Sequence, residues 1–146
     1  MMGDLKRTEV KRKNRELSMS LPVPPSVNAI YYNTRGGGRR LTSKAEKYIR
    51  DVRALANMFV DDSKWEKKND HTWIYMDMIF YFPDKRTRDS HNCLKILLDA
   101  LEGIVFNNDM FVMPRINSVE FDKDNPRVEI KFYDQTTAER AKQLNK

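Results

Sequence analysis

A short stretch near the middle of the chain carries acidic, imidazole and ammonium side chains. Asp89 and His91 stand two residues apart, Lys95 follows four residues after His91, and Asp109 comes later. Phosphodiester hydrolysis needs a cation that activates water, and proteins hold Mg²⁺ through one or two carboxylates and water. The stretch therefore favours metal-assisted phosphate chemistry. Its candidate metal ligands are Asp89, His91 and Asp109, and Lys95 is the candidate contact to the scissile phosphate.

Each of these residues also has a purely structural interpretation. Asp89 can cap a helix and Asp109 can belong to a turn, and their spacing alone does not separate these roles from metal binding. Lys95 can form a surface ion pair with Asp99, and His91 can simply form a hydrogen bond near a helix start. The stretch by itself leaves both interpretations open.

The whole chain fits one domain with a basic surface. It has 146 residues, 40% of them hydrophobic, and a formal net charge of +6. That charge favours a polyanionic partner without distinguishing nucleic acid from a membrane surface. Between positions 35 and 53 the net charge is +5, so much of the excess is concentrated in one loop and helix. The basic residues there are Arg35, Arg39, Arg40, Lys44, Lys47, Arg50 and Arg53.

The cellular setting is predicted from what the sequence lacks. Cys93 is the only cysteine, so no intrachain disulfide can form and no zinc-binding spacing exists. The charged N-terminal region has no apolar signal core, and no run of residues is apolar enough to span a membrane. We expect a cytoplasmic protein without a membrane partner.

The elements that position these residues begin after residues 1–16, which we expect to form a flexible basic arm. Alternating apolar residues predict a strand over 17–23, and residues 24–40 are expected to form a long flexible loop containing Gly36-Gly37-Gly38. A helix capped by Ser43 follows, with apolar residues repeating at helical spacing.

The second half of the chain predicts a strand, a helix and a hairpin. Residues 73–82 are apolar on both strand faces, which is typical of a central strand. The helix that follows Asp89 should end at Gly103. Strands at 116–121 and 128–132, joined by the turn residues Asp124-Asn125-Pro126, are expected to pair as a hairpin. Residues 134–146 are expected to form a tail or short helix.

Two motifs together resemble the RusA family of Holliday junction resolvases. That family has an Asp-x-Asp-Asn-x-x-Lys-x-x-x-Asp-x-Leu run followed by a glycine and an acidic pair, and here the run reads from Asp89 to Leu101, with Gly103 and Asn108-Asp109 after it. The family's Pro-Pro-Ser-x-Asn signature and Ser-Lys helix start match residues 24–28 and Ser43-Lys44. The likeness spans about residues 17–133.

The resemblance implies a small α/β (α+β) domain, with a mixed four-stranded sheet packed by two main helices, that works as a homodimer on four-way or branched DNA. By the same resemblance Asp89 and Asp109 match metal-binding acids, and Lys95 matches the lysine near the scissile phosphate. The implied cofactor is Mg²⁺. The basic residues expected to contact DNA phosphates are Arg35, Arg39, Arg40, Lys44, Lys47, Arg86 and Arg88.

The sequence departs from the family pattern at two positions. His91 stands where the family has its second Asp, and Asn108 stands at the first place of the later acidic pair. Fewer carboxylates hold Mg²⁺ less strongly, and imidazole suits Mn²⁺ better. The leading hypothesis is a metal-dependent endodeoxyribonuclease acting in recombination and repair. The alternative is a junction-binding protein of the same fold with lost or altered cleavage.

Overall fold

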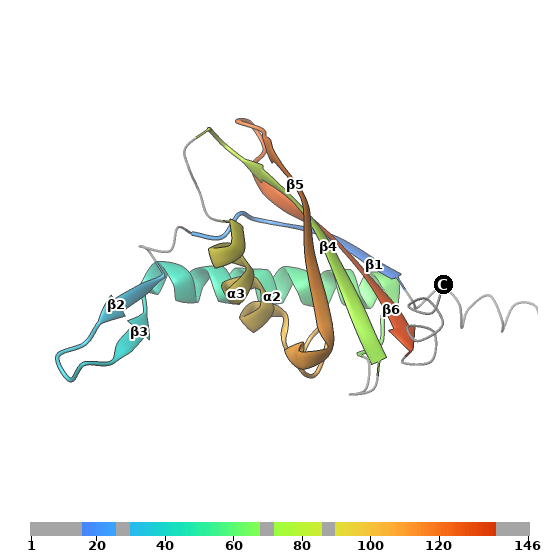
Figure 1. The fold of residues 1–146 in the computed structure, drawn as a ribbon, viewed down its shortest axis with the longest axis horizontal. Coiled ribbons are helices and arrows are strands. Elements are labelled where there is room, and N and C mark those ends of the chain that lie inside the picture. The colour runs from blue at the N-terminus through green and yellow to red at the C-terminus, as the bar shows by residue number, and fades with distance from the viewer. Residues whose placement is uncertain (1–15, 26–29, 68–71, 86–89, 137–146) are drawn as a thin grey trace, which may run out of the picture.

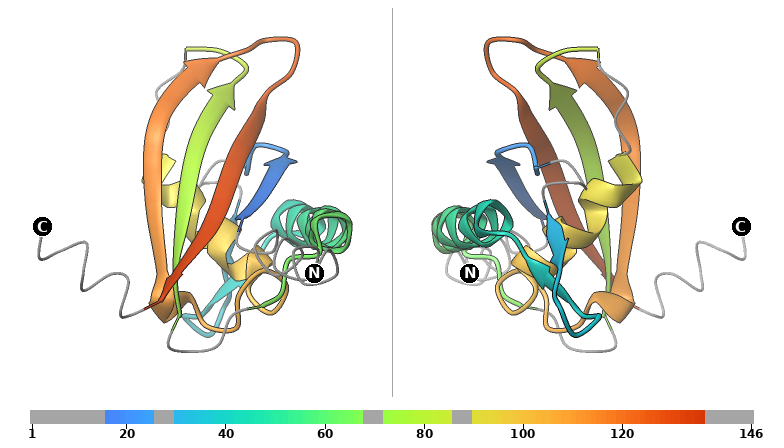
Figure 2. Two further views of the ribbon diagram at one scale, coloured as in Figure 1. Left: turned by 90° about the vertical axis from the view of Figure 1, so that its right-hand side faces the viewer. Right: turned by 90° about the vertical axis from the view of Figure 1, so that its left-hand side faces the viewer.

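The computed structural model describes residues 16–25, 30–67, 72–85 and 90–136, without the side chains of 90–92 and 135–136. Four strands form a mixed sheet in the order β1-β6-β4-β5 (Figure 1). Helices α2 (Ser43–Ser63) and α3 (Ser90–Leu101) both lie on one side of this sheet (Figure 2). The expected fold, a small α+β domain with a mixed four-stranded sheet and two main helices, is confirmed. The strands are β1 (Glu16–Leu21), β4 (Thr72–Phe82), β5 (Val112–Phe121) and β6 (Arg127–Thr136).

Strand β4 is central, as its sequence predicts. It pairs parallel with β5 on one side and antiparallel with β6 on the other. One of its faces packs against the helices through five side chains with at most 2% exposure: Ile74, Met76, Met78, Phe80 and Phe82. The alternate residues, including Tyr75 and Ile79, are half-buried. The helix-covered face therefore carries the main core.

The first strand and the first helix form close to their predicted bounds. β1 stops at Leu21, two residues before the predicted end, because Pro22 has no N–H to donate to a sheet. The cap of α2 is Thr42 rather than Ser43: the Thr42 hydroxyl accepts a hydrogen bond from the Ala45 N–H at 3.2 Å. Ser43 is already helical, so the prediction was wrong by one residue.

The expected hairpin between the last two strands is wrong. The chain does reverse at 122–126, where the Asn125 N–H donates to the Asp122 carboxylate at 3.2 Å. The two strands nevertheless lie on opposite sides of β4, and β6 pairs with β4 and β1. The turn residues correctly mark the reversal of the chain but do not determine which strands pair.

The segment from β4 to β5 is a crossover connection between parallel strands. α3 runs back along the sheet, so that β5 can begin at Val112 beside Ile74, near the start of β4. Gly103 ends α3 with a φ of +87°, a left-handed conformation that favours glycine. A 3₁₀ turn, η3 (Asp109–Phe111), leads directly into β5.

The predicted flexible loop contains a second, two-stranded sheet. β2 (Tyr31–Asn33) and β3 (Arg39–Leu41) pair antiparallel and project from the body of the domain (Figure 1). The Thr34 N–H donates to the Gly38 carbonyl at 2.8 Å, which closes the turn. Arginine side chains at 35, 39 and 40 are thus carried on an ordered hairpin, and the expectation of an irregular loop over 24–40 is corrected.

The expected basic arm lies outside the described residues except for Glu16, and so does the chain beyond Thr136. β6 extends three residues past Tyr133, the expected end of the domain. No helix in the described part of the chain is long and apolar enough to cross a membrane.

Candidate active site and nucleic-acid interface

The predicted site residues fall around α3, and part of the set lies outside the described residues. Asp89, Arg86 and Arg88 precede α3 in a segment that is not described. His91 belongs to the first turn of α3 by its backbone, and its side chain is also outside the described set. The geometry of the site is therefore built from Lys95, Asp109 and their surroundings.

Lys95 lies on the exposed side of α3. Its neighbours Ile96 and Leu97 are 3% and 0% exposed and pack into the core. The helix face that carries Lys95 is therefore turned away from the core. The described residues include no ion pair between Lys95 and Asp99. The surface ion pair considered from the sequence does not form, and the ammonium group faces solvent.

Asp109 begins η3, where its side chain is exposed. The preceding Asn108 caps this turn, because its side-chain oxygen accepts a hydrogen bond from the Met110 N–H at 2.9 Å. Phe111 anchors the turn on β4 through an edge-on contact with Trp73, with ring centroids 5.2 Å apart. Asn and Asp cap helices about equally well. Asn108 therefore caps this turn as an Asp at the same position could, but without the negative charge.

Helix α3 lies between the two parts of the predicted metal site within one chain. His91 is in the first turn of α3, which follows the carboxyl end of β4, whereas Asp109 precedes the amino end of β5. A helix of 12 residues is about 18 Å long. Among the described residues, no three His, Cys, Asp or Glu side chains are placed to hold a metal ion. The length and direction of α3 place its start at the opposite end of the helix from the connection that leads to Asp109.

The predicted DNA-binding residues that are described form one continuous basic element. Arg35, Arg39 and Arg40 are exposed on the β2–β3 hairpin, which leads through Thr42 into the first turns of α2. Lys44 and Lys47 are exposed on those turns. Lys47 also pairs with Asp51 at 2.7 Å, an exposed pair that contributes little to stability.

An open groove of about 670 Å³ lies beside this basic element. Lys44, Lys47 and Asp51 line it from α2, and the remaining wall is rich in proline, with contributions from 22–25, 83 and 126. An apolar wall facing two ammonium groups and one carboxylate carries a net positive charge and suits a sugar–phosphate backbone, whose phosphates are anionic and whose sugars are largely apolar. The groove is the concave part of the candidate nucleic-acid interface.

The start of α3 lies toward the same end of α2 as this groove. Tyr48, which lines the groove, donates its hydroxyl to the Pro22 carbonyl at 2.7 Å. Burial, and secondarily the nearby Cys93 thiol of α3, raise the pKa of Tyr48 well above its ordinary value. Further along both helices, Arg53 contacts the C-terminal end of α3. The first turns of α3 therefore lie toward the groove lined by Lys44 and Lys47, here called the lysine groove.

Arg53 has a role that its place in the basic cluster did not indicate. It is half-buried, and its Nη1 donates to the carbonyls of Ala100 at 3.0 Å and Glu102 at 2.9 Å. The indole N–H of Trp65 similarly donates to the Val105 carbonyl at 2.9 Å. These two residues hold the connection between α3 and η3. The contacts span 40 or more positions, so local sequence patterns carry no signal for them.

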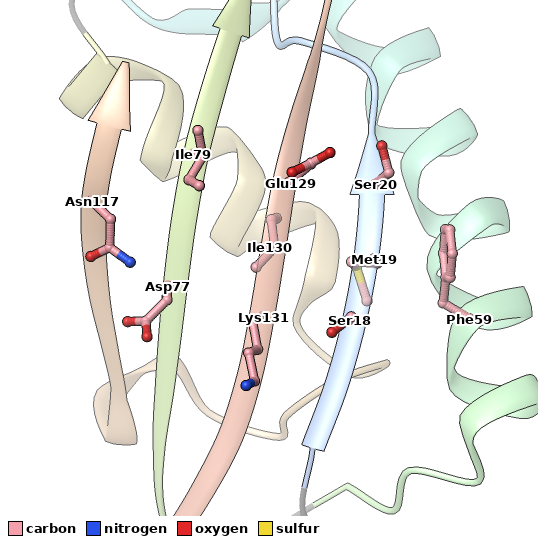
Figure 3. Close-up of a pocket in the computed structure, with 10 residues that line it drawn as sticks. All are labelled: Ser18, Met19, Ser20, Phe59, Asp77, Ile79, Asn117, Glu129, Ile130 and Lys131. Carbon is pink, nitrogen blue, oxygen red and sulfur yellow. The ribbon is translucent and has the colours of Figure 1, made fainter. Parts of the chain in front are cut away.

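A second hollow, of about 540 Å³, lies on the open face of the sheet. Figure 3 shows its lining side chains, among them Asp77, Glu129 and Lys131, on the face opposite α3. Its lining carries two carboxylates, those of Asp77 and Glu129, against the one ammonium group of Lys131, and this excess of negative charge does not favour a polyanion. Asp77 there forms a 2.6 Å ion pair with Arg115, which joins β4 to the edge strand β5. We do not assign this hollow to the candidate site.

The chain is similar to a known protein family and to a phage protein. The family described as "Endodeoxyribonuclease RusA" matches residues 22–133. A crossover junction endodeoxyribonuclease, rusA of Enterobacteria phage HK97, is 33% identical over 94 residues, which is 64% of this chain and 73% of the phage protein. The matched range includes the lysine groove, α3, η3 and most of the sheet.

Proposed function

The chain belongs to the RusA family of endodeoxyribonucleases, and on this premise we propose that it cuts four-way and related branched DNA by phosphodiester hydrolysis. The observation that carries the proposal is the arrangement around α2: the basic hairpin, the lysine groove and the first turns of α3 lie at the same end of this helix. A DNA backbone bound in the groove would pass close to the segment that carries Lys95.

The donor chemistry fits a hard divalent cation. The phage relative is a crossover junction endodeoxyribonuclease, and hydrolysis of a phosphodiester by water is accelerated when Mg²⁺ or Mn²⁺ polarises the phosphate. Proteins hold Mg²⁺ with few carboxylates and with substrate phosphates, so the exposed carboxylate of Asp109 is a suitable ligand. Asp89 and His91 are the proposed further ligands, and imidazole at position 91 favours Mn²⁺ over Mg²⁺.

The chain's own residues then have separate tasks. The exposed Lys95 ammonium group would lie against the phosphate and stabilise the negative charge that develops on it during hydrolysis. Asn108 would hold η3 in the conformation that presents Asp109. Arg53 and Trp65 would fix the connection that sets the position of η3 relative to α3.

A homodimer would bring the separated ligands together. In a two-fold assembly Asp109 of the partner subunit could complete a site with the start of α3 from the first subunit. Two equivalent sites would also suit a junction that needs two symmetric cuts. The separation of Asp109 from the first turn of α3 within one chain supports this arrangement.

The function is tested by incubating the protein with a labelled four-way junction and with a linear duplex, each with Mg²⁺, Mn²⁺ or EDTA. We expect metal-dependent cuts near the branch point of the junction and none in the duplex, with Mn²⁺ at least as effective as Mg²⁺. Tight binding of the junction without any metal-dependent product would instead indicate a junction-binding protein that has lost cleavage.

The dimer is tested by mixing two inactive variants, Asp89→Asn and Asp109→Asn. If each site takes ligands from both subunits, a mixed dimer contains one intact site, and nicked junction should appear. If each site lies within one subunit, both sites of the mixed dimer are damaged and the mixture stays inactive. Each variant alone serves as the control.

A further inference from the structure

The β2–β3 hairpin exposes the side chain of one tyrosine, Tyr32, to solvent. Tyr31 and Leu41 are opposite each other and pack partly against the core, whereas Tyr32 and Arg40 form the next opposite pair. Successive side chains of a strand point to opposite faces, so Tyr32 and Arg40 share the face that is turned away from the core. Tyr32 is 50% exposed.

The neighbouring tyrosine is covered and Tyr32 is not. The Arg39 guanidinium lies over the Tyr31 ring, 4.4 Å from its centroid. Within the described part of the chain, no side chain stacks on Tyr32 or forms a hydrogen bond with it. The hairpin thus holds an aromatic face open to solvent beside the Arg40 guanidinium, at a place where the sequence predicted only a flexible loop.

The charge of the hairpin indicates what kind of partner this ring meets. Residues 30–41 contain three arginines and no acidic residue. Proteins that bind single-stranded nucleic acid combine such a positive surface with aromatic rings on which bases stack. The phosphates of a duplex can form ion pairs with the arginines. The bases of a duplex cannot stack on the Tyr32 ring, because they are already stacked on one another.

The hairpin is also built to hold its shape. Three hydrogen bonds between Thr34 and Gly38 close the turn. The Thr34 N–H and the Thr34 hydroxyl both donate to the Gly38 carbonyl, at 2.8 and 3.2 Å, and the Gly38 N–H donates to the Thr34 hydroxyl at 3.1 Å. At the base, the Thr42 N–H donates to the carbonyl of the buried Ile30 at 2.8 Å. An ordered platform loses less conformational entropy on binding than a flexible loop.

We propose that Tyr32 stacks on a base exposed at the branch point of the DNA and so makes the protein prefer branched over linear DNA. This inference rests on the proposed function, since it specifies how that function selects its substrate. Arg40 beside the ring would bind the phosphate of the same nucleotide, and the lysine groove would hold the adjoining duplex arm.

The test measures dissociation constants for a four-way junction and for a linear duplex of the same sequence, in EDTA so that no strand is cut. Tyr32→Ala should weaken junction binding about tenfold, the loss typical of one stacked base, and leave duplex binding unchanged. Tyr32→Phe, which keeps the ring, should bind like the wild type. Met58→Ala removes a similarly exposed apolar side chain from α2 and is the matched control.

A second measurement reports the stacking itself. The fluorescence of 2-aminopurine placed at the branch point falls when the base is stacked, so wild type and Tyr32→Phe should quench it more than Tyr32→Ala. Equal losses for junction and duplex, or no loss for either, would overturn the proposal for Tyr32. A wild type that prefers junctions but cuts none with Mg²⁺ or Mn²⁺ contradicts the nuclease function alone.

Discussion

Arg53 of α2 binds the carbonyl oxygens of both Ala100 and Glu102, at 3.0 and 2.9 Å, and thereby closes the C-terminal end of α3. The last carbonyls of a helix have no partners within the helix, so a cationic donor there is favourable. The same contact determines where the chain leaves α3 on its way to η3 and Asp109. A residue about 50 positions away in the sequence thus fixes the path toward the candidate site.

We expect Arg53→Met to lower the free energy of unfolding by about 1–3 kcal/mol, because the part-buried hydrogen bond to the Ala100 carbonyl and the exposed one to the Glu102 carbonyl both lose their charged donor. Cleavage should fall as well, since η3 is less firmly placed, while affinity for the junction should change little. Urea unfolding and cleavage rates measure the two effects. Arg50→Met, which removes an exposed arginine one turn earlier, should leave the stability unchanged.

Asp109→Asn should abolish cutting and leave junction affinity nearly intact. The substitution keeps the shape of the side chain and removes the charge that would bind the metal. Asp99→Asn removes another exposed carboxylate, from α3 itself, and should retain cleavage. Binding and product formation on one labelled junction provide the measurement. Joint loss of binding and cutting would assign Asp109 a structural role.

Neutralising Arg39 and Arg40 together with glutamine should weaken binding and reduce the slope of log affinity against log salt by about 2. Each arginine that binds a phosphate releases about one counterion, so the change in slope gives the number of phosphates that the variant no longer neutralises. Titrations at several salt concentrations measure it. Lys123→Gln, at the exposed turn between β5 and β6, should leave the slope unchanged. An unaltered slope in the double variant would argue against the hairpin as a DNA contact.

The buried Tyr48 should make the free energy of unfolding fall at alkaline pH. Its pKa is raised in the folded protein above the ordinary value of 10.0, mainly by burial, so the folded state favours the neutral phenol. The associated stability is present in full below about pH 10, where the unfolded chain is also neutral, and is lost as the pH rises further. Urea unfolding at pH 8 and above pH 10 should show a steeper decline for the wild type than for Tyr48→Phe. Parallel declines would mean that other groups cause the loss.

The sequence predicted those features of the fold that local patterns determine. The alternation through β4 and the helical spacing in α2 and α3 reflect which residues meet the core, so these elements lie close to their expected positions. The pairing of β6 was missed because the Asp124-Asn125-Pro126 turn is equally compatible with adjacent strands and with strands separated by β4. Pairing depends on the crossover through α3, which is a non-local property.

The choice of Asp89, His91, Lys95 and Asp109 as the site stays a prediction, because the side chains of Asp89 and His91 lie outside the described residues. The structure adds that Lys95 and Asp109 are exposed and that the basic residues from Arg35 to Lys47 lie on the hairpin and the first turns of α2. The supporting contacts of Arg53 and Trp65 could not be predicted, because they connect residues that are distant in sequence. Tyr32 fell within the expected flexible loop over 24–40, because its local spacing does not reveal that this segment forms a hairpin projecting from the domain.

The sheet order has a consequence for how the protein is made. β1 pairs only with β6 among the described strands, and this pairing joins Leu21 to Val128. A chain leaving the ribosome therefore exposes β1 throughout the synthesis of α2, β4, α3 and β5, and its sheet partner arrives last. The domain should complete its fold only after translation has passed residue 136. Until then β1 has no sheet partner, and it is the strand most exposed to pairing with another nascent copy of the chain.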